Sequence, residues 1–305
     1  MRLRDAGLFV RARLSRTLTG ALNARSAIAL PVPLPLEAVV ARPDPSPLDL
    51  ARLLEGRSNV EREALLGRYL AARGVRFETE RFATFEGAGA NYVAEVGAGP
   101  RTLVLIAHHD AVPGSPGAND NAAAVGILLR LLDRVAAAPP PRLTLRFLFT
   151  AAEELGYLGA RAYVRSPAAR RVAAALSLEL CGIGDQLALW DAPGETELSR
   201  SFAHAVVGLG YRRDETFHVV GRVPVFGSDH RAFLEVGIPA HGLTVLPGAE
   251  AEALRRFIFR PWRSLFHRRP RPFDTYHTAR DRSETLEAAA LDRVGAALEA
   301  LIRAF

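Results

Sequence analysis

The segment RTLVLIAHHD, residues 101–110, places a continuous apolar run directly before three polar residues. A run of this kind, bounded by charged and turn residues, is typical of a strand that is buried on both faces. Similar runs occur at 141–151, 172–180 and 239–246, and the segment 75–82 alternates in the manner of a strand. Strands buried on both faces need covering layers on both sides of the sheet, which restricts the chain to a layered architecture.

Segments with helical periodicity separate these predicted strands. After Asn121, apolar residues recur at the spacing of one helix face, at Val125, Leu128, Leu129, Leu132 and Val135. Further helices are expected at 58–74, which opens on a capping box, and at 197–209, 228–236 and 283–305. The alternation predicts an α/β fold, a three-layer sandwich in which helices cover both faces of a central, twisted, mostly parallel mixed sheet.

The first 47 residues differ in composition from the rest of the chain. Residues 1–27 are rich in arginine and poor in acidic residues, and 31–47 contains six prolines. We expect 1–27 to be a loosely ordered extension or a packing helix rather than a segment lying on an anionic membrane surface. The segment 31–47 is predicted to be an extended linker. Residues 1–47 would then form an N-terminal extension, and 48–305 a single domain.

Composition excludes several kinds of chemistry. All 39 basic residues are arginine, so a Schiff base or a lysine general base is not available. The lone Cys181 cannot support a disulfide framework or a cysteine-rich metal site. Any metal must therefore be held by His, Asp and Glu. Because there is neither a long apolar run nor a clear secretory signal, we expect a cytoplasmic protein.

Polar residues cluster where the predicted strands end, which is where α/β sheets bind ligands. His108 and Asp110 should point to the same side of the chain and His109 to the other. His108 is thus the better metal ligand, and Asp110 can accept the second N–H of its imidazole. His109 is expected to be a wall or core residue. Asp120 sits where a loop meets a helix amino terminus, a position that a plain N-cap would also occupy.

The next two strands end in glutamates. Glu153 and Glu154 are adjacent, and two carboxylates about 4 Å apart would repel by roughly 4 kcal/mol at an effective dielectric near 20. A positive group is therefore expected beside them, with one glutamate binding a metal and the other transferring protons. Alone, such a pair is more often a solvated turn. Glu179 lies in an otherwise apolar strand, where a buried unpaired charge would cost several kcal/mol.

The segment DTYHTARD adds Tyr276, His277 and Asp281 ahead of the last helix. Three carboxylate ligands carry three negative charges, which two divalent ions and one hydroxide balance. The charge balance therefore favours two metals over one. With nitrogen and oxygen ligands and no thiolate, zinc is the leading candidate, and cobalt or manganese could substitute for it.

Six motifs in this order resemble one known family: AHHD, GANDN, AAEELGYLGA, LELCG, GSDHRAF followed by GIPA, and YHTARD. The chain resembles the family-twenty-eight zinc metallopeptidases, which include bacterial leucyl aminopeptidases and glutamate carboxypeptidase. The resemblance runs from about residue 60 to the end, and it implies a zinc aminopeptidase fold with a single catalytic domain.

The resemblance also implies roles for the motif residues. One zinc would be held by His108 and Glu179, the other by Glu154 and His277, with Asp120 bridging them. Glu153 would be the general base. Tyr276 would hydrogen-bond the developing oxyanion, and Asp110 would support His108. The peptide bond between Asp120 and Asn121 is expected to be cis, as is common in the family.

One position departs from the family pattern. The family usually has aspartate where this chain has Glu179, and the extra methylene changes the reach of the carboxylate by over an angstrom. The second zinc could then be held differently, with Asp185 a weaker substitute ligand. Two zinc ions are expected and one is the alternative.

The function that we expect is that of a zinc-dependent exopeptidase, an aminopeptidase first, acting on a peptide substrate. The alternatives are a glutaminyl cyclase that uses one zinc and a non-catalytic binding domain that has kept the fold. Neither nucleic acid nor a membrane is an expected partner.

Two further segments have structural and functional interpretations. Residues 254–273 carry seven arginines and five aromatics, and are expected to form a surface loop with snorkelling arginines. If the loop has a function, it would rim the pocket and select negatively charged substrates. Ser228, Asp229 and His230 could shape the pocket, although a helix cap by Ser228 explains much of their pattern.

Overall fold

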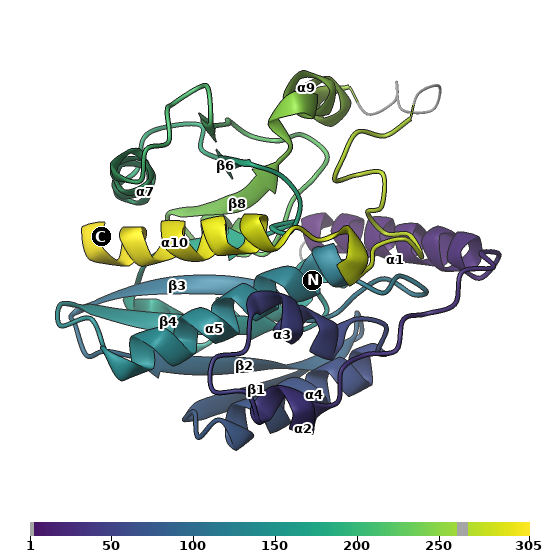
Figure 1. Ribbon diagram of the computed structural model, residues 1–305, viewed down its shortest axis with the longest axis horizontal. Coiled ribbons are helices and arrows are strands. Elements are labelled where there is room, and N and C mark those ends of the chain that lie inside the picture. The colour runs from purple at the N-terminus through teal and green to yellow at the C-terminus, as the bar shows by residue number, and fades with distance from the viewer. Residues whose placement is uncertain (1–2, 261–267) are drawn as a thin grey trace.

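The computed structural model describes residues 3–260 and 268–305, and it shows one mixed sheet between two helical layers (Figure 1). The eight strands lie in the order β1-β2-β4-β3-β5-β8-β6-β7. Strands β4, β3, β5 and β8 pair in parallel with their neighbours, as do β6 and β7. The pairs β1–β2, β2–β4 and β6–β8 are antiparallel. Their bounds are β1 Phe77–Ala83, β2 Ala88–Val96, β3 Arg101–His108, β4 Leu143–Thr150, β5 Val172–Leu178, β6 Gln186–Trp190, β7 Phe217–Val219 and β8 Ala240–Leu246.

Helices cover both faces, so the predicted three-layer α/β sandwich is confirmed. The helix bounds are α1 Leu3–Asn23, α2 Leu36–Val40, α3 Pro47–Leu54, α4 Asn59–Ala72, α5 Ala123–Ala137, α6 Leu158–Tyr163, α7 Glu197–Gly208, α8 His230–Glu235, α9 Ala251–Phe259 and α10 Ala288–Ala304. The larger apolar core joins one face of the sheet to α3, α4, α5, α7 and α10. The smaller core joins the other face to α6 and α8.

Strand β3 shows why the sheet is central. Leu103, Leu105 and Ala107 contribute to the larger core, whereas Val104 and Ile106 contribute to the smaller one. All five side chains are fully buried. Because successive side chains of a strand point to opposite faces, a continuous apolar run fits a strand covered on both sides. The strands predicted from apolar runs are all present, whereas β2, β6 and β7 were not predicted.

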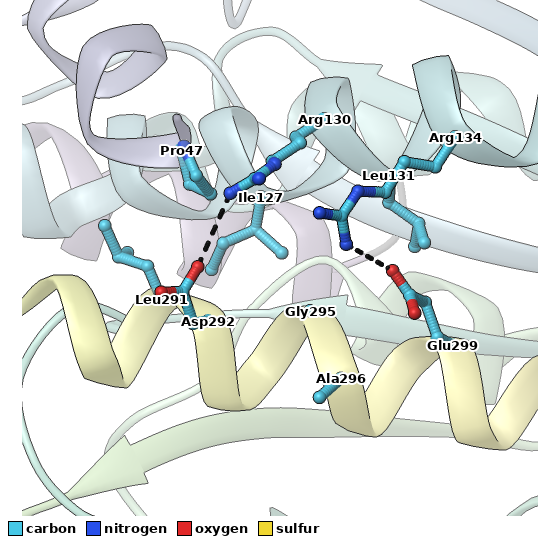
Figure 2. A pocket seen from close by; sticks show the side chains of 10 residues that line it. All are labelled: Pro47, Ile127, Arg130, Leu131, Arg134, Leu291, Asp292, Gly295, Ala296 and Glu299. Atoms are coloured by element: carbon cyan, nitrogen blue, oxygen red, sulfur yellow. Dashed lines mark hydrogen bonds and ion pairs between the residues drawn. The ribbon is translucent and has the colours of Figure 1, made fainter. Parts of the chain in front are cut away.

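Helices α5 and α10 pack side by side on the larger core (Figure 2). Two ion pairs bridge them, from Arg130 Nη1 to Asp292 Oδ1 at 3.5 Å and from Arg134 Nη1 to Glu299 Oε1 at 2.7 Å. Gly295 of α10 leaves a shallow hollow between the two pairs. Helix α5 begins beside the loop that carries Asp120, so this packing fixes one side of the candidate site.

Two expectations for irregular segments are wrong. The proline-rich segment 31–47 contains helix α2, and its Leu36 and Val39 are buried in the larger core. Pro35 is at the N-cap position directly before the helix, where a missing N–H breaks no helical hydrogen bond. This proline therefore starts a helix rather than extending a linker. Within 254–273, residues up to Phe259 form the end of α9 rather than a loop, and residues 261–267 lie outside the described part.

Helix α1 packs beyond the strand ends from which the ligand loops leave (Figure 1). Its Asn23 donates hydrogen bonds to the carbonyls of Pro113 at 3.0 Å and His277 at 3.1 Å. Arg11 donates to the carbonyl of Val225 at 3.4 Å. Of the two expectations for residues 1–27, the packing helix is therefore the one observed. The boundary at residue 48 stays a prediction.

Among the described residues, no helix combines the length and the apolar character that crossing a bilayer requires.

Candidate metal centre

The parallel strands bring the predicted site residues to one edge of the sheet. β3 ends at His108, Glu153 and Glu154 follow β4 in a tight turn, and Glu179 comes directly after β5. Because β4, β3 and β5 are parallel neighbours, their carboxyl ends meet. Asp120 reaches the same edge from the turn that precedes α5.

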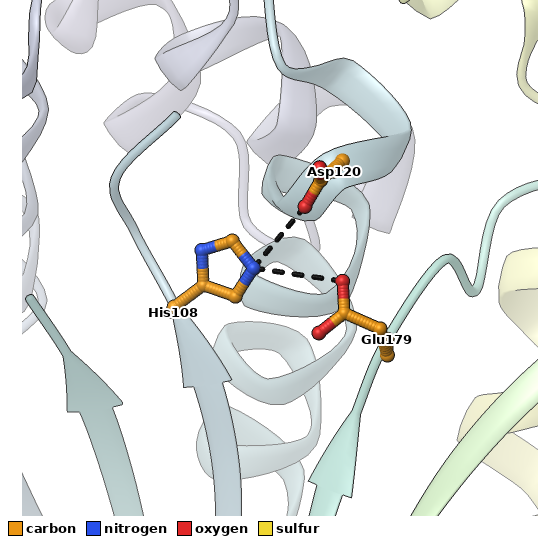
Figure 3. A group of neighbouring side chains, drawn as sticks. All are labelled: His108, Asp120 and Glu179. Atoms are coloured by element: carbon orange, nitrogen blue, oxygen red, sulfur yellow. Dashed lines mark ion pairs between the residues drawn. The ribbon is translucent and has the colours of Figure 1, made fainter. Parts of the chain in front are cut away.

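One group of possible ligands consists of His108, Asp120 and Glu179 (Figure 3). His108 Nε2 lies 3.2 Å from Asp120 Oδ1 and 3.6 Å from Glu179 Oε1. Burial raises the pKa of the Glu179 carboxyl to about 7, although the neighbouring His108 opposes this. The three side chains come from three separate elements and point toward one another.

A second group consists of Asp120, Glu154 and His277. His277 Nε2 lies 3.0 Å from Asp120 Oδ2 and 3.1 Å from Glu154 Oε1. Burial lowers the pKa of His277, but the charges of Glu154 and Asp120 outweigh this effect and raise it to about 10. Asp120 offers one oxygen to each group, so all five residues predicted as metal ligands converge on two adjacent points.

The residues fit divalent cations. Four of the converging atoms are buried and have no hydrogen-bond partner among the described residues: His108 Nε2, Asp120 Oδ2, Glu154 Oε1 and His277 Nε2. Buried polar groups without partners are rare because each costs free energy. His277 Nε2 nevertheless lies at ion-pair distance from the oxygens of Asp120 and Glu154, where a bound cation could take the place of a proton. Two imidazoles and three carboxylates suit zinc, cobalt or manganese.

The loop that carries Asp120 is held by a second carboxylate. Asp281 accepts hydrogen bonds from the backbone N–H groups of Asn119 at 2.7 Å and Asp120 at 3.1 Å. The Asn121 side chain donates to the carbonyl of Leu178 at 2.8 Å and ties the loop to β5. The peptide bond between Asp120 and Asn121 is cis, as the resemblance implied. Asp281 was noted in the sequence without a role.

Arg62 of α4 is a supporting residue that sequence reasoning missed. Its buried guanidinium donates to the carbonyls of His109 at 3.2 Å and Gly117 at 3.1 Å, and also to that of Pro116. It therefore holds both ends of the loop that joins β3 to Asp120. A sequence signal existed, because Arg62 interrupts the apolar face that Leu65 continues one turn later.

Asp110 supports two of the site's segments. Its carboxylate accepts the backbone N–H groups of Glu153 at 2.9 Å and Glu154 at 3.2 Å. Nδ1 of His108 lies 3.1 Å from the backbone carbonyl of Asp110 and 3.5 Å from its carboxylate. The nearer acceptor of the imidazole N–H is thus the carbonyl rather than the expected carboxylate. A carbonyl fixes the ring equally well.

Glu153 faces an apolar cavity next to the ligand groups. Glu179 and Tyr276 also line this cavity, and the remaining lining is mainly apolar, including Trp190, Val223, Phe226, Leu254 and Phe273. Burial raises the pKa of the Glu153 carboxyl well above its usual range, and the charges of Glu154 and Glu179 add to the effect. The ring of Tyr276 stacks on that of His277, with centroids 3.7 Å apart.

Ser228 was expected to cap a helix, but in the structure it contacts a ligand residue. Ser228 does not cap α8, whose N-terminal cap position is Asp229 and lacks a side-chain cap. Instead its hydroxyl donates to Glu179 Oε2 at 2.8 Å and lies 3.1 Å from the hydroxyl of Ser177. His230 contacts Asp191 at 3.0 Å, away from the ligand groups.

Two residues that were considered weaker candidates for metal binding lie outside the ligand groups. His109 Nε2 contacts the backbone carbonyl of Ala90 at 3.1 Å and is buried, as expected for a core residue. Asp185 accepts the backbone N–H of Gly248 at 2.7 Å and is not among the converging carboxylates.

Comparison with known proteins shows which family the chain matches. Residues 91–302 match the model of peptidase family M28. A probable lipoprotein aminopeptidase of Mycobacterium tuberculosis is 30% identical over 183 residues, which is 53% of this chain and 35% of that protein. The aminopeptidase YwaD of Bacillus subtilis is 43% identical over 65 residues, 21% of this chain and 14% of that protein. The chain thus spans a minor part of either relative.

Two solved structures share the fold. A zinc aminopeptidase from Bacillus subtilis superposes with a TM-score of 0.57 and 22% identity, covering 72% of this chain and 51% of that chain. A glutaminyl cyclase from an Acidobacteriales bacterium gives a TM-score of 0.63 and 19% identity, covering 92% and 98%. At these identities the likeness establishes the fold.

Proposed function

The chain belongs to peptidase family M28, and from this premise we propose that it is a metal-dependent exopeptidase, most simply an aminopeptidase. The observation that carries the proposal is the pair of ligand groups that share Asp120. Two buried imidazoles and three carboxylates from separate parts of the chain meet there at ion-pair distance, and one carboxylate is common to both groups. Such a set of nitrogen and oxygen atoms suits a pair of divalent cations.

Two divalent cations, zinc first, would be held by His108 with Glu179 and by His277 with Glu154, Asp120 being common to both. Such a pair, when bound, supplies a Lewis acid for the substrate carbonyl and makes a water molecule acidic. His108 would keep its orientation because the carbonyl of Asp110 accepts its second N–H.

Glu153 is the proton carrier in the proposed reaction. Its carboxylate takes one proton from water as the water oxygen bonds to the scissile carbonyl carbon. The same proton then passes to the amide nitrogen as the C–N bond breaks, so the products are a free amine and a carboxylic acid, which keeps the second proton of the water until it ionises into solvent. A carboxyl whose pKa is raised by burial suits both halves of this transfer.

Tyr276 would donate a hydrogen bond to the oxygen that becomes negatively charged. Burial raises the pKa of its phenol well above the usual range, and the charges of Asp120 and Glu154 add to this. The hydroxyl therefore stays protonated and remains a donor at neutral pH.

The apolar cavity beside Glu153 would receive the side chain of the substrate's first residue. Trp190, Val223 and Leu254 line it, so an apolar side chain would be buried favourably there. A charged side chain would find no ion-pair partner among these residues. We therefore expect an apolar amino-terminal residue to be preferred over a charged one.

Glutaminyl cyclisation is the second candidate, favoured by two observations. Glu179 stands where the family usually has aspartate, and the solved cyclase is matched over 98% of its length. A cyclase of the single-zinc type would need only one of the two ligand groups. A non-catalytic binding role fits less well, because none of the five ligand residues is missing.

The experiment combines metal removal with a substrate panel. The purified protein is stripped with a chelator, reloaded with zinc, and assayed on amino-acid arylamides and on a peptide that begins with glutamine. We expect arylamide hydrolysis to disappear with the metal and to return with two zinc equivalents. Cyclisation of the glutamine peptide at one equivalent, without arylamide hydrolysis, would favour the cyclase instead.

A further inference from the structure

A groove runs between helix α1 and the segment 268–280, directly beside the metal centre. Its volume is about 650 Å³. Ser15, Thr19 and Asn23 form the α1 wall, and the opposite wall leads to Tyr276 and His277. The volume falls in the range of about 300 to 1,000 Å³ that is usual for ligand pockets, so the groove can take more than one amino-acid residue.

Helix α1 is tied to this position by contacts specific to the site's loops. The Asn23 side chain donates to the carbonyls of both Pro113 and His277, one from each of two ligand-bearing loops. Its close approach depends on Gly114, where any Cβ would lie 2.6 Å from the Cβ of Asn23. The φ angle of 77° at Gly114 also disfavours other residues. The wall is therefore part of the site's construction.

The groove and the apolar cavity meet at a shared set of aromatic residues. Phe226, Phe273 and Tyr276 line both hollows. Glu153 faces the cavity, and His277 faces the groove. A peptide whose scissile bond lies at the metal centre can thus place its first side chain in the cavity and its remaining residues in the groove.

The groove carries positive charge. Arg268, Arg269 and Arg280 line it together with one acidic residue, Asp274. The Asp274 carboxylate is 3.3 Å from Arg268, and its backbone carbonyl accepts Arg280 Nη2 at 2.9 Å. Arg269 is exposed, and no ion pair joins it to another described residue. Two of the three guanidinium charges are left unbalanced within the groove.

We propose that this groove binds the part of a short peptide that follows the scissile bond, and that Arg269 and Arg280 bind a carboxylate on it. That carboxylate is the peptide's own C-terminus or an acidic side chain, since guanidinium recognises both alike. The inference rests on the proposed exopeptidase function and adds the substrate class, short peptides with a negative charge beyond the first residue.

The test compares tripeptides that share an apolar first residue. Leu-Ala-Glu, Leu-Ala-Gln and the C-terminal amide of Leu-Ala-Gln carry decreasing negative charge, and leucine arylamide reports hydrolysis without reaching along the groove. We expect kcat/KM to fall by about tenfold in all from the first to the third tripeptide, equivalent to about 1.4 kcal/mol. The difference should shrink as salt is raised.

Variants assign the preference to the groove. In Arg269→Gln combined with Arg280→Gln, the ratio of kcat/KM between the acidic peptide and the amide should approach one. Arg255→Gln is the matched control, because Arg255 is an exposed arginine of α9 that lines neither hollow. Its ratio should equal that of the unaltered protein.

The outcomes separate this inference from the function on which it rests. Hydrolysis of leucine arylamide with equal kcat/KM for the three tripeptides would overturn the inference and leave the exopeptidase intact. A preference that survives in the double variant would overturn it as well. Failure to hydrolyse any of the four substrates with zinc bound would overturn the proposed function, and the inference with it.

Discussion

At the scale of single residues, the site separates two adjacent carboxylates, Glu153 and Glu154, which strand alternation alone does not assign to separate roles. The turn after β4 is tight because Ala152 has a φ of 56° and Gly156 a φ of 84°. As a result Glu154 lies beside His277, whereas Glu153 faces the apolar cavity. One side chain can then bind a cation while its neighbour stays available for proton transfer.

This separation predicts the behaviour of Glu153→Gln. The amide cannot accept a proton, so turnover should fall on the order of 10² to 10⁴-fold, the usual contribution of a general base. Zinc content should stay unchanged. The matched variant Glu154→Gln should instead lose zinc, because it removes a ligand. Metal analysis of both variants decides the assignment, and zinc loss in Glu153→Gln would show that Glu153 is itself a ligand.

Ser228 explains how Glu179 fits where the family usually has aspartate. Its hydroxyl donates a hydrogen bond to Oε2 of Glu179, so Oε1 is the oxygen that faces His108. We expect Ser228→Ala to weaken binding of the zinc held there by about 10- to 100-fold, the range for loss of a partner that orients a ligand. The other zinc should bind as before. Calorimetric titration with zinc measures both constants, and Ser199→Ala, which alters the cap of α7, is the control. Two unchanged constants in Ser228→Ala would contradict this role.

The raised pKa of His277 predicts a pH dependence of metal binding. In the apoprotein a pKa of about 10, above the ordinary value near 6.5, means that His277 carries a proton at neutral pH. Zinc requires the neutral imidazole, so binding must release that proton. Affinity should therefore rise with pH by up to about tenfold per unit between pH 7 and 9. Titrations in buffers of different ionisation enthalpy count the protons released, and a count near zero at pH 7.5 would contradict the prediction.

At the scale of elements, the loop between β3 and α5 is the part that other elements must support. The loop backbone bonds to Arg62 of α4 and to Asp281 of the segment before α10. The loop's own Asn121 donates to β5. Asp281 satisfies two backbone N–H groups of the loop, and Arg62 supplies donors to its carbonyls. The ligands are thus positioned by residues that are not ligands themselves.

Arg62→Met tests this support. The substitution keeps most of the apolar stem but removes the donor of the buried His109 carbonyl, whereas the carbonyls of Pro116 and Gly117 keep backbone N–H donors. One unsatisfied buried group costs about 1–3 kcal/mol, so we expect the free energy of unfolding to fall by about that amount and zinc affinity to fall with it. Arg68→Met on the exposed side of α4 should change stability by less than about 0.5 kcal/mol. Equal denaturation midpoints for the two variants would refute the role of Arg62.

The elements also show which parts of the fold a sequence reveals. The continuous apolar runs of β3, β4, β5 and β8 identified central strands because burial on both faces leaves no polar positions. β6 and β7 are short and their pairing depends on distant segments, so no local pattern marked them. His108, Glu154 and Glu179 were candidates because they lie at strand ends, whereas the full ligand set with Asp120 and His277 came from the resemblance to the family. Partners such as Ser228 and Asp281 could not be assigned, because they contact the ligands only through the tertiary arrangement.

At the scale of the whole molecule, residues 3–47 pack against the rest of the described chain. Helix α1 forms a wall beside the metal centre, and α2 buries Leu36 and Val39 in the larger core. The segment between them also pairs with the body, since Leu34 donates its N–H to the carbonyl of Arg52 at 2.9 Å. A cut at residue 48 would therefore expose apolar surface.

Two truncations test this integration. Burying an aliphatic side chain contributes about 1.5–3 kcal/mol, so removal of residues 1–47 should cost about 3–6 kcal/mol more than removal of 1–30, which spares Leu36 and Val39. Chemical denaturation of the two truncated proteins measures the difference. Equal stabilities would support a separate domain that begins at residue 48.

We propose that five residues from distant parts of the chain hold two cations around Asp120. The most direct measurement is anomalous diffraction from crystals of the zinc-loaded protein. We expect two zinc peaks, one contacted by His108 and Glu179, the other by Glu154 and His277, with an Asp120 oxygen at each. Crystals saturated with zinc that show no peak between these side chains, or a single peak lacking Asp120, would contradict it.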